Sequence, residues 1–597
     1  MRNTPDIFSA RAGREVRGDV RGSNRGESAG AYFKIGCALN KRGESFMTLR
    51  ACVFVLMSAT LLAQEPPPFA PPPNREVAAP NVSFERLLQS NKEPQNWLTY
   101  SGGLSSQRHS LLNAINASNA RELELKWVFQ SRSLDRHQVT PLVVDGTMYT
   151  IQSPNDVVAL NAATGKQIWI YSYTPDPAAK NCCGRFSRGV AISGDTVFLA
   201  SFDARIIAID ARNGRELWKT EPAGDPKQGY AFTHAPLVVK DKVIAGTAGG
   251  EFGVRGFIAA WDVKTGKEVW RFHTVPGPGE PGYESWSGDS WMHGGAPVWV
   301  TGSYDPETNL TYWGTGNPGP DWDGAGRLGD NLYSCSVIAI DPDTGQLKWH
   351  YQFSPHNEFD WDSTQVPVLA DLEWQGRPRK VMLWANRNGM FHVLDRTNGA
   401  FLKGQPFVKV NWADGFDDKG RPIPVPGMAP TKEGTLIYPG NQGGTNWYSP
   451  SFSPRTGLFY IPAWENTSTT YIKDDNPPVF REGQGFSGLF PRPGSSADDV
   501  HSSIQAIDPK TGMKRWTYRL SAALTEGGVL TTSGDVLFTG GRDGTFLALD
   551  ARSGKLLWQT NLGPSVAAGP MTYAINGKQY VSVMAGSALY TFGLRER

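Results

Sequence analysis

Two adjacent cysteines, Cys182 and Cys183, carry the most specific chemical signal in the sequence, where they stand in the segment NCCGRFSRG. Adjacent cysteines can form a disulfide only by closing a strained eight-membered ring, and such a bond needs an oxidising compartment. The alternative is a pair of ordinary core thiols. Arg188 follows in the same segment, and taken alone an arginine at this place would be a surface charge.

Oxygen donors suited to a hard metal ion lie further along the chain. Glu251 stands in the glycine-rich bend TAGGEFG, where its carboxylate could bind such a cation. Gly249 and Gly250 in that bend would let the backbone approach a flat ligand closely. Asn317, in GTGNP, offers an amide oxygen. A lone loop glutamate is otherwise solvated and a lone asparagine otherwise supports a turn, so a metal site depends on the remaining pattern.

Asp360 and Asp362 are separated by one residue in the segment HNEFDWDSTQ. If this segment is a strand, both carboxylates face the same side, because side chains alternate along a strand with a period of two. The alternative for Asp362 is that it caps a turn or faces water.

The elements that must position these residues are indicated by a repeat, A-x-D/N-x-x-T/N/S-G-x-x-x-W. Each copy is typical of an apolar strand, a turn capped by Asp in which Gly takes a positive φ, and a second strand that ends in Trp. A degenerate copy at 393–402 lacks the Trp, and SPRTGLFYIPAW at 453–464 is counted as a further unit. The full copies span residues 159–169, 208–218, 260–270, 339–349, 506–516 and 548–558.

Close neighbours among these copies start 42–52 residues apart, which is the length of a four-stranded propeller blade. The Trp of each copy should pack between adjacent blades. Trp127, in ELELKWVF, is expected in an N-terminal strand that closes the ring against the last blade, so that no sheet edge stays free. The sequence therefore predicts an all-β fold, an eight-bladed β-propeller with tryptophan-docking repeats, over residues 81–597.

Composition excludes several classes of protein. The 597 residues include 59 Lys+Arg and 57 Asp+Glu, and a net charge of +2 argues against a nucleic-acid binder. Aromatic residues make up 11% of the chain, which argues against disorder. Five cysteines are too few for a disulfide scaffold, and the absence of CxxC and CxxCH excludes a zinc ribbon and a c-type haem on this chain.

The N-terminal region has the features of an export signal. Arg50 precedes an apolar run at 51–62, which is too short to span a bilayer, so 47–63 is predicted to be a signal peptide. Because a signal peptide should lie at the start, we expect Met47 to be the true initiator and 1–46 to be a non-native upstream extension. The Pro-rich residues 64–80 predict a stiff linker. We expect a periplasmic protein without a membrane span; the alternative for 51–62 is a buried strand.

The repeats and the segments quoted above resemble those of the quinoprotein alcohol dehydrogenases, which use pyrroloquinoline quinone (PQQ). The resemblance runs from about Trp97 to Leu594. It implies that PQQ lies between a disulfide of the adjacent cysteines and the ring of Trp299. Arg188 then contacts the quinone oxygens, and Thr233 a PQQ carboxylate. The other cofactor-binding positions that it implies are Gln138, Gly249, Gly250, Arg387, Asn446 and Trp447.

The same resemblance implies one metal ion beside PQQ, held by Glu251, Asn317, Asp360 and Asp362. Asp360 matches the catalytic aspartate, which acts as general base toward the substrate hydroxyl. Calcium-dependent methanol dehydrogenases tend to have a small residue at the position of Asp362, whereas lanthanide-dependent relatives have Asp. The metal is therefore Ca²⁺ or a lanthanide, and Asp362 favours the lanthanide.

The implied activity is oxidation of small primary alcohols such as methanol or ethanol to aldehydes. Because this chain has no CxxCH, the implied electron acceptor is a separate c-type cytochrome. The chain departs from the family pattern in two places: Gln138 stands where the family often has Glu, and methanol dehydrogenases carry Ser near Ala248. The alternatives are a non-catalytic periplasmic propeller scaffold and a PQQ dehydrogenase for a sugar or polyol. The sequence defines no oligomeric state, and a homodimer stays open.

Overall fold

The computed structural model describes residues 74–488, 491–494, 498–520 and 525–596, and Pro73–Arg597 form one compact unit. The predictions for 1–46, for 47–63 and for residues 64–73 of the linker lie outside the described residues. Among the residues that are described, none of the helices combines the length and the apolar character needed to cross a membrane.

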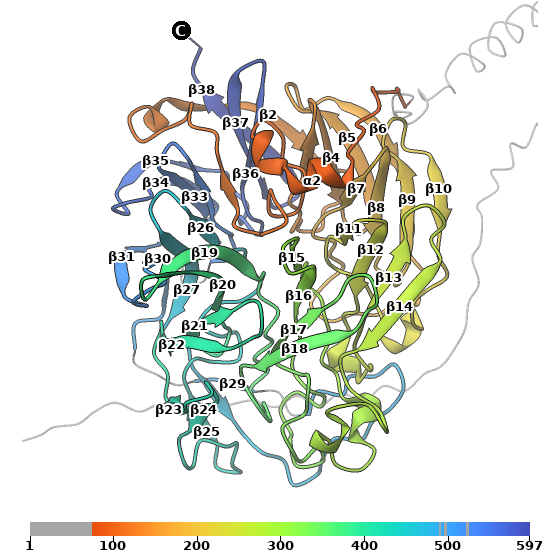
Figure 1. Cartoon of the computed structure of the whole chain (residues 1–597), viewed down its shortest axis with the longest axis vertical. Helices are drawn as coiled ribbons and strands as arrows, with labels where there is room; N and C mark the ends of the chain where they lie inside the picture. The colour runs from red at the N-terminus through yellow and green to blue at the C-terminus, as the bar shows by residue number, and fades with distance from the viewer. Residues whose placement is uncertain (1–73, 489–490, 495–497, 521–524, 597) are drawn as a thin grey trace, which may run out of the picture. The chain divides into compact units, whose positions relative to one another are not determined.

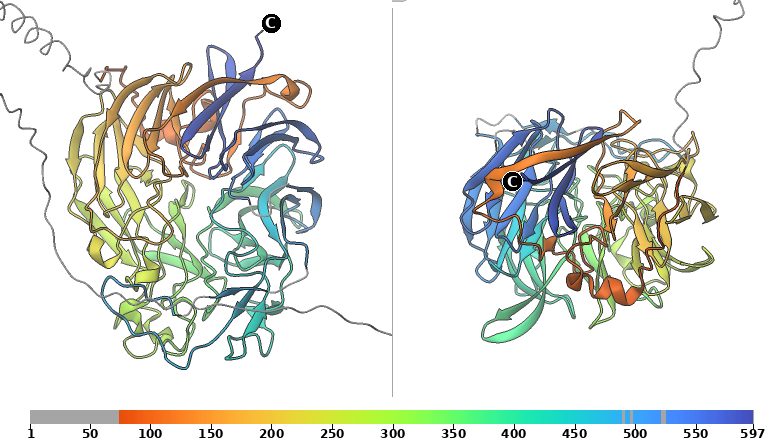
Figure 2. Two further views of the ribbon diagram at one scale, coloured as in Figure 1. Left: turned by 180° about the vertical axis from the view of Figure 1, so that it is seen from behind. Right: turned by 90° about the horizontal axis from the view of Figure 1, so that it is seen from above.

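Sheets arranged around a common centre build this unit, as Figures 1 and 2 show, and all the described strand pairs are antiparallel except one short parallel pair in the sheet that begins with β1 (His109–Ser110). The first sheets along the chain each use four consecutive strands: β3 (Leu142–Val144), β4 (Thr147–Gln152), β5 (Asp156–Asn161) and β6 (Gln167–Tyr171); β7 (Ala191–Ser193), β8 (Thr196–Ala200), β9 (Ile206–Asp210) and β10 (Glu216–Lys219); β11 (Leu237–Val239), β12 (Lys242–Gly246), β13 (Phe257–Asp262) and β14 (Glu268–His273); β15 (Ser303–Asp305), β16 (Leu310–Gly314), β17 (Ser336–Ile340) and β18 (Leu347–Gln352); β19 (Val368–Trp374), β20 (Arg377–Ala385), β21 (Met390–Asp395) and β22 (Phe401–Pro406).

The later sheets combine strands from more distant parts of the chain: β26 (Ser451–Ser453) and β27 (Leu458–Glu465) with β30 (His501–Ile507) and β31 (Lys514–Arg519); β1 (His109–Ser110) with β32 (Leu530–Thr532), β33 (Val536–Gly540), β34 (Thr545–Asp550) and β35 (Leu556–Asn561); β2 (Leu123–Gln130) with β36 (Met571–Ile575), β37 (Lys578–Ala585) and β38 (Ala588–Leu594). The smaller elements are the pair β23 (Ala413–Phe416) and β24 (Pro422–Pro424), the sheet of β25 (Thr435–Ile437), β28 (Thr469–Tyr471) and β29 (Arg492–Pro493), the helix α2 (Phe84–Leu88), and the 3₁₀ turns η1 (Ser90–Lys92), η2 (Ala120–Glu122), η3 (Pro226–Gln228), η4 (Gly250–Phe252), η5 (Tyr283–Ser285) and η6 (Ser290–His293).

An early strand of the chain and its last strand pair in one sheet. Strand β2 pairs antiparallel with β38 in the register Leu123 with Leu594 and Gln130 with Ala588, and the two strands lie side by side in Figure 1. The predicted closing strand around Trp127 is thereby confirmed.

One predicted propeller unit, the segment at 453–464, is wrong. The 453–464 segment does not form a sheet of its own, because β26 and β27 share a sheet with β30 and β31, which carry the 506–516 repeat. The long segment between β27 and β30 separates the two halves of this sheet in the sequence, so that each half looks like a separate unit.

Trp127 and most tryptophans of the repeats dock on the turn of the next sheet, in agreement with the prediction that they pack between adjacent blades. Trp127 Nε1 donates to the Ala162 carbonyl at 3.2 Å, and Trp169 Nε1 donates to the Ala211 carbonyl at 3.1 Å. The turn glycine packs directly against the tryptophan ring. Gly165 has φ +70°, and a Cβ built on it would lie 2.5 Å from a ring carbon of Trp127. Only glycine combines this backbone with this contact, which explains why Gly and Trp recur together.

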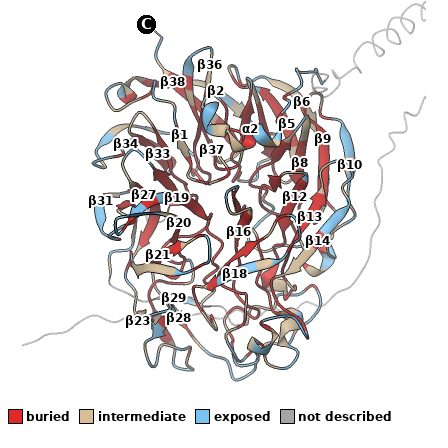
Figure 3. Ribbon diagram, viewed as in Figure 1, coloured by how far each residue is buried: buried red, intermediate tan, exposed pale blue. Residues whose placement is uncertain are grey.

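Burial decreases from the centre of each sheet toward its fourth strand (Figure 3). Strand β9 is buried along its whole length, whereas most residues of β10 are exposed. The apolar strands form several hydrophobic clusters, and the first of them joins sheets from the start of the described chain to sheets from its end. Trp127, Trp169 and Trp270 belong to that cluster.

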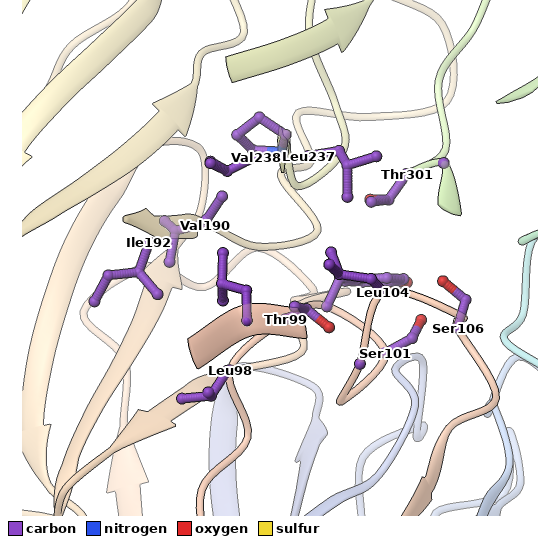
Figure 4. Close-up of a pocket in the computed structure, with 16 residues that line it drawn as sticks. Leu98, Thr99, Ser101, Leu104, Ser106, Val190, Ile192, Leu237, Val238 and Thr301 are labelled. Atoms are coloured by element: carbon purple, nitrogen blue, oxygen red, sulfur yellow. The ribbon is translucent and has the colours of Figure 1, made fainter. Parts of the chain in front are cut away.

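A small cavity of about 20 Å³ lies where residues 98–106 pack against β7 and β11 (Figure 4). It is lined mainly by aliphatic side chains such as Leu104, Ile192 and Val238. Its volume matches about one water molecule, so it is a packing defect and not a ligand site.

Candidate active site

The predicted site residues lie in two kinds of loop. Gln138, Arg188, Thr233, Trp299 and Trp447 each come three or four residues before the first strand of a sheet. Glu251, Asn317 and Arg387 lie in loops that join the second strand of a sheet to the third. In an antiparallel sheet these two loops are at the same end, so the sheets of the propeller bring all of them to one face.

These loops surround a cavity of about 220 Å³. Among the residues that line it are most of those predicted from sequence: Gln138, Cys182, Cys183, Arg188, Thr233, Gly249, Glu251, Trp299, Asp360, Asp362, Arg387, Asn446 and Trp447. Ala248, a position that departs from the family pattern, also lines it. Gly250 and Asn317 do not: a Cβ on Gly250 would face Pro297, and Asn317 is buried behind the carboxylates.

Cys182 and Cys183 are free thiols in this structure, so the predicted disulfide is not formed here. Cys182 is half-buried, and its Sγ donates to Glu251 Oε1 at 2.8 Å. A hydrogen bond to Cys183, followed by burial, raises the pKa of the Cys182 thiol well above its usual range. The pair thus lies directly against one of the predicted metal ligands.

Arg188 is a buried cation between two aromatic rings. Its guanidinium carbon lies 4.3 Å from the ring centre of Trp447 and 5.0 Å from that of Trp299. One guanidinium nitrogen donates to the carbonyl and the hydroxyl of Thr233, at 3.1 and 3.2 Å. Burial lowers the pKa of Arg188 to about 10, which leaves it charged at neutral pH.

Three polar atoms of the residues that line this cavity have no hydrogen-bond partner among the described residues: Nε of Arg188, Oε1 of Gln138 and Oδ1 of Asn181 are all buried and unpaired. Buried polar groups are nearly always hydrogen-bonded, so these atoms indicate a polar ligand. A flat, acidic molecule fits this wall, because the two tryptophans offer ring faces and Arg188 offers a positive charge.

In the same cavity, the Arg387 guanidinium is ion-paired with two carboxylates, and a third, Glu251, interacts with it electrostatically. Asp360 Oδ2 accepts from Arg387 at 2.9 Å, and Asp362 Oδ2 accepts from the same side chain at 2.7 Å. Burial raises the pKa of Asp360 well above its usual range and also raises those of Asp362 and Glu251. Burial alone would lower the pKa of Arg387, but attraction to Asp360 and Asp362 outweighs it and raises the value.

This cluster has one cation for three acids, so it carries excess negative charge when the acids are ionised. Buried charges are retained when they are paired or bind metals, and carboxylate oxygens are the donors that hard cations take. The donor types of Glu251, Asp360 and Asp362 therefore suit a metal ion of high charge. The group of ligand atoms found within 4.8 Å of one another among the described residues is that of Cys182, Cys183 and Glu251, so the three carboxylates do not yet converge on one point.

The strand geometry predicted for Asp360 and Asp362 is wrong. Neither residue lies in a strand, and Asp360 has φ +58°, in the left-handed region. The two carboxylates converge because Arg387 binds both and because Asp362 Oδ1 also accepts the backbone N–H of Asn317 at 2.8 Å. Tertiary contacts, and not the period of a strand, bring them together.

Sequence reasoning missed several residues of the cavity wall: Arg136, Asn181, Phe186, Gln442, Tyr448 and Glu526. Most of them are close neighbours in sequence of predicted residues, so a search of flanking positions could have found them. Glu526 has no such signal. It joins the wall as the ion-pair partner of Arg136, from a loop 390 residues away.

Comparisons with known proteins agree with this geometry. Residues 97–411 and 520–581 match the PQQ family model described as glucose/ethanol/alcohol dehydrogenase, beta-propeller domain. The quinohemoprotein alcohol dehydrogenase ADH IIB of Pseudomonas putida is 40% identical over 90% of this chain and 78% of its own length. The lanthanide-dependent methanol dehydrogenase of Methylacidiphilum fumariolicum strain SolV is 36% identical over 84% of this chain and 86% of its own.

A solved structure of a europium-containing methanol dehydrogenase superposes with a TM-score of 0.80 at 33% identity, covering 85% of this chain and all of that one. The family model spans more than half of the chain, and the relatives exceed 30% identity over most of their length. The chain is therefore a member of the PQQ-dependent alcohol dehydrogenases, the quinoprotein enzymes built on a β-propeller.

Proposed function

We propose that this protein is a periplasmic enzyme that oxidises small primary alcohols of the methanol and ethanol class to aldehydes. It uses PQQ and one metal ion and passes electrons to a separate c-type cytochrome. The observation that carries this proposal is one cavity that contains a cation between two tryptophans, a second arginine ion-paired with two aspartates, and the carboxylate of Glu251.

The residues of the chain divide into two sets by the group that they would hold. Arg188, Thr233 and Gln138 offer polar contacts to the acidic edge of PQQ, while Trp299 and the Cys182–Cys183 pair would cover its two faces. Glu251, Asn317, Asp360 and Asp362 would hold the metal. When bound, PQQ supplies an electrophilic carbon that accepts hydride, and the metal supplies Lewis acidity.

Asp360 is the general base of the proposed reaction. Its carboxylate would take the hydroxyl proton of the alcohol. Burial raises its affinity for that proton, while the ion pair with Arg387 at 2.9 Å favours the ionised form that a base needs. Arg387 also binds the backbone carbonyl of Asn441 at 2.8 Å, which holds the guanidinium in place between the two aspartates.

The size of the cavity favours a small substrate. About 220 Å³ lies below the usual range of about 300–1,000 Å³ for small-molecule sites. A planar cofactor would occupy most of this space, which leaves little room for a sugar. Of the two metals, Asp362 supports a lanthanide, since one more carboxylate offsets a third positive charge.

Further parts of the proposal concern the fold and the cellular context. We infer eight blades, one for each of the larger sheets that contain β3, β7, β11, β15, β19, β26, β32 and β36. We infer that Cys182 and Cys183 form a disulfide in the exported protein and that export uses residues 47–63. Mass spectrometry of the periplasmic protein after thiol alkylation tests both, because a disulfide blocks labelling and signal cleavage sets the N-terminus.

The experiment that tests the activity measures dye-linked alcohol oxidation by protein reconstituted with PQQ and either Ca²⁺ or La³⁺. Methanol, ethanol and a longer alcohol are compared. Activity with La³⁺ that falls more than about tenfold in Asp362→Ala, with Ca²⁺ activity less affected, supports the lanthanide assignment. Activity with Ca²⁺ alone makes Asp362 a bystander, and the absence of PQQ binding with both metals refutes the proposed function.

A further inference from the structure

Asp321 is a fourth buried carboxylate beside the candidate metal ligands, and it has no role in the proposed function. It lies in the loop between β16 and β17, four residues after Asn317, and is 1% exposed. Burial, followed by repulsion from Asp360 and Glu251, raises its pKa well above the usual range. The carboxylate is therefore close to the cluster, although it does not line the cavity.

The contacts of Asp321 involve the one amide among the proposed metal ligands. Its Oδ1 accepts from Asn317 Nδ2 at 2.8 Å, and the same nitrogen donates to the Pro318 carbonyl at 3.1 Å. An amide nitrogen has two protons, so these two bonds use both of them. The orientation of the amide follows: its nitrogen faces Asp321, and its oxygen faces away from that carboxylate.

This orientation matters because an asparagine side chain has two ends of opposite chemistry. A hard cation binds the carbonyl oxygen and is repelled by the NH₂ group. A rotation of the amide by half a turn would exchange the two ends. The rotation would turn the amide oxygen toward Oδ1 of Asp321 and the Pro318 carbonyl, the two oxygens that now accept from the amide nitrogen, and so would replace two hydrogen bonds by contacts between oxygens.

The loop that carries Asp321 is held in place by a buried arginine. Arg327 is fully buried and donates to the Pro320 carbonyl at 3.0 Å and to the Asn357 carbonyl at 2.6 Å. These bonds join the Asn317 loop to the segment that leads into Asp360. Asp321 thus stands at a defined position relative to Asn317.

We propose that Asp321 is a positioning residue that holds the Asn317 amide with its oxygen toward the metal. The inference depends on the proposed function in one respect, since it takes Asn317 as a metal ligand. Residues that hydrogen-bond to a metal ligand orient that ligand, and their removal typically lowers metal affinity by about 10–100-fold.

The test is a double-mutant cycle read out as metal affinity. Full-length protein loaded with PQQ and stripped of metal is titrated calorimetrically with La³⁺ and, separately, with Ca²⁺. Asp321→Ala is expected to weaken binding of both ions by about 10–100-fold. In the Asn317→Ala background the same substitution is expected to have no further effect, because no amide remains to be oriented.

Asp323→Ala is the matched control. Asp323 lies two residues further on in the same loop, is also buried, and accepts from the Ala325 N–H at 2.9 Å. Its removal disturbs the loop without touching Asn317 and should leave metal affinity close to that of the wild type. A loss equal to that of Asp321→Ala would show a general effect of loop damage and overturn the proposal.

Asp321→Asn keeps the shape of the side chain and an acceptor oxygen, and it decides the question where the alanine variant does not fold. Affinity close to wild type supports the hydrogen-bond role. A loss that persists in the Asn317→Ala background shows that Asp321 acts through its charge alone, and the proposal then fails. If Asn317→Ala by itself leaves metal affinity unchanged, Asn317 is not a ligand and the proposed metal shell is the part that is wrong.

Discussion

The packing of Trp127 against Gly165 offers a test of how the propeller is held closed. Gly165 has φ +70°, and a Cβ at this residue would lie 2.5 Å from one carbon of the Trp127 ring and 2.8 Å from another. Gly165→Ala therefore combines a left-handed backbone, which costs about 1–2 kcal/mol, with overpacking, which costs about 1–3 kcal/mol. We expect a loss of about 2–5 kcal/mol in the free energy of unfolding.

Gly146→Ala is the matched control in the same sheet. Gly146 has φ +84° in the turn between β3 and β4, but a Cβ there would meet no heavy atom within 4 Å. Only the cost of the left-handed backbone remains, so we expect a loss of about 1–2 kcal/mol in the free energy of unfolding. The gap between the two variants, about 1–3 kcal/mol, is the part due to the tryptophan contact.

The assay is equilibrium unfolding in urea, followed by tryptophan fluorescence and circular dichroism with PQQ absent. The two probes must give one transition before free energies are compared. If Gly165→Ala is no less stable than Gly146→Ala, the contact with Trp127 does not contribute and the docking argument is refuted. In a Trp127→Leu background the gap should shrink, because the ring that the added methyl meets is gone.

Three further outcomes follow from the site. Asp360→Asn should lower alcohol oxidation by about 10²–10⁴-fold while PQQ binding, followed by absorbance, persists; unchanged turnover would remove Asp360 as the base. Arg188→Lys keeps the charge but loses the flat guanidinium between Trp299 and Trp447, so the Kd for PQQ should rise about tenfold or more. An unchanged Kd, measured by equilibrium dialysis, would contradict the assignment of this arginine to PQQ binding. Arg327→Met leaves the Pro320 and Asn357 carbonyls without their buried donor and should reduce the free energy of unfolding, measured in urea, by about 1–3 kcal/mol. An unchanged free energy would show that Arg327 does not hold the Asn317 loop to the segment before Asp360.

Much of the fold could be predicted because its signals are local. The turn in each repeat needs an Asp or Asn to cap it and a Gly to reverse it, and the Trp must follow at a fixed distance to reach the next sheet. These constraints act within about a dozen residues, so they are visible as a pattern. The closing strand was predictable for the same reason, since Trp127 docks on Gly165 as Trp169 docks on Gly214.

The prediction of a separate propeller unit at 453–464 failed because the pairing of this segment depends on strands far away in the chain. Its strands β26 and β27 belong to the same sheet as the 506–516 repeat, although a long segment separates them in the chain. Strand pairing across such a segment depends on the assembled sheet, and the sequence on either side of it shows only two unrelated halves.

The sequence by itself determined which residue types the site contains: the adjacent cysteines, the glycine bend with Glu251, and the Asp360–Asp362 pair were all visible in short segments. Their mutual geometry was decided by the tertiary structure alone. Asp360 and Asp362 converge on Arg387 through loop contacts, Asp321 reaches Asn317, and Glu526 meets Arg136 from the far end of the chain. The physical reason is that the loops of different sheets meet only once the ring has closed, and no spacing within one segment encodes that meeting.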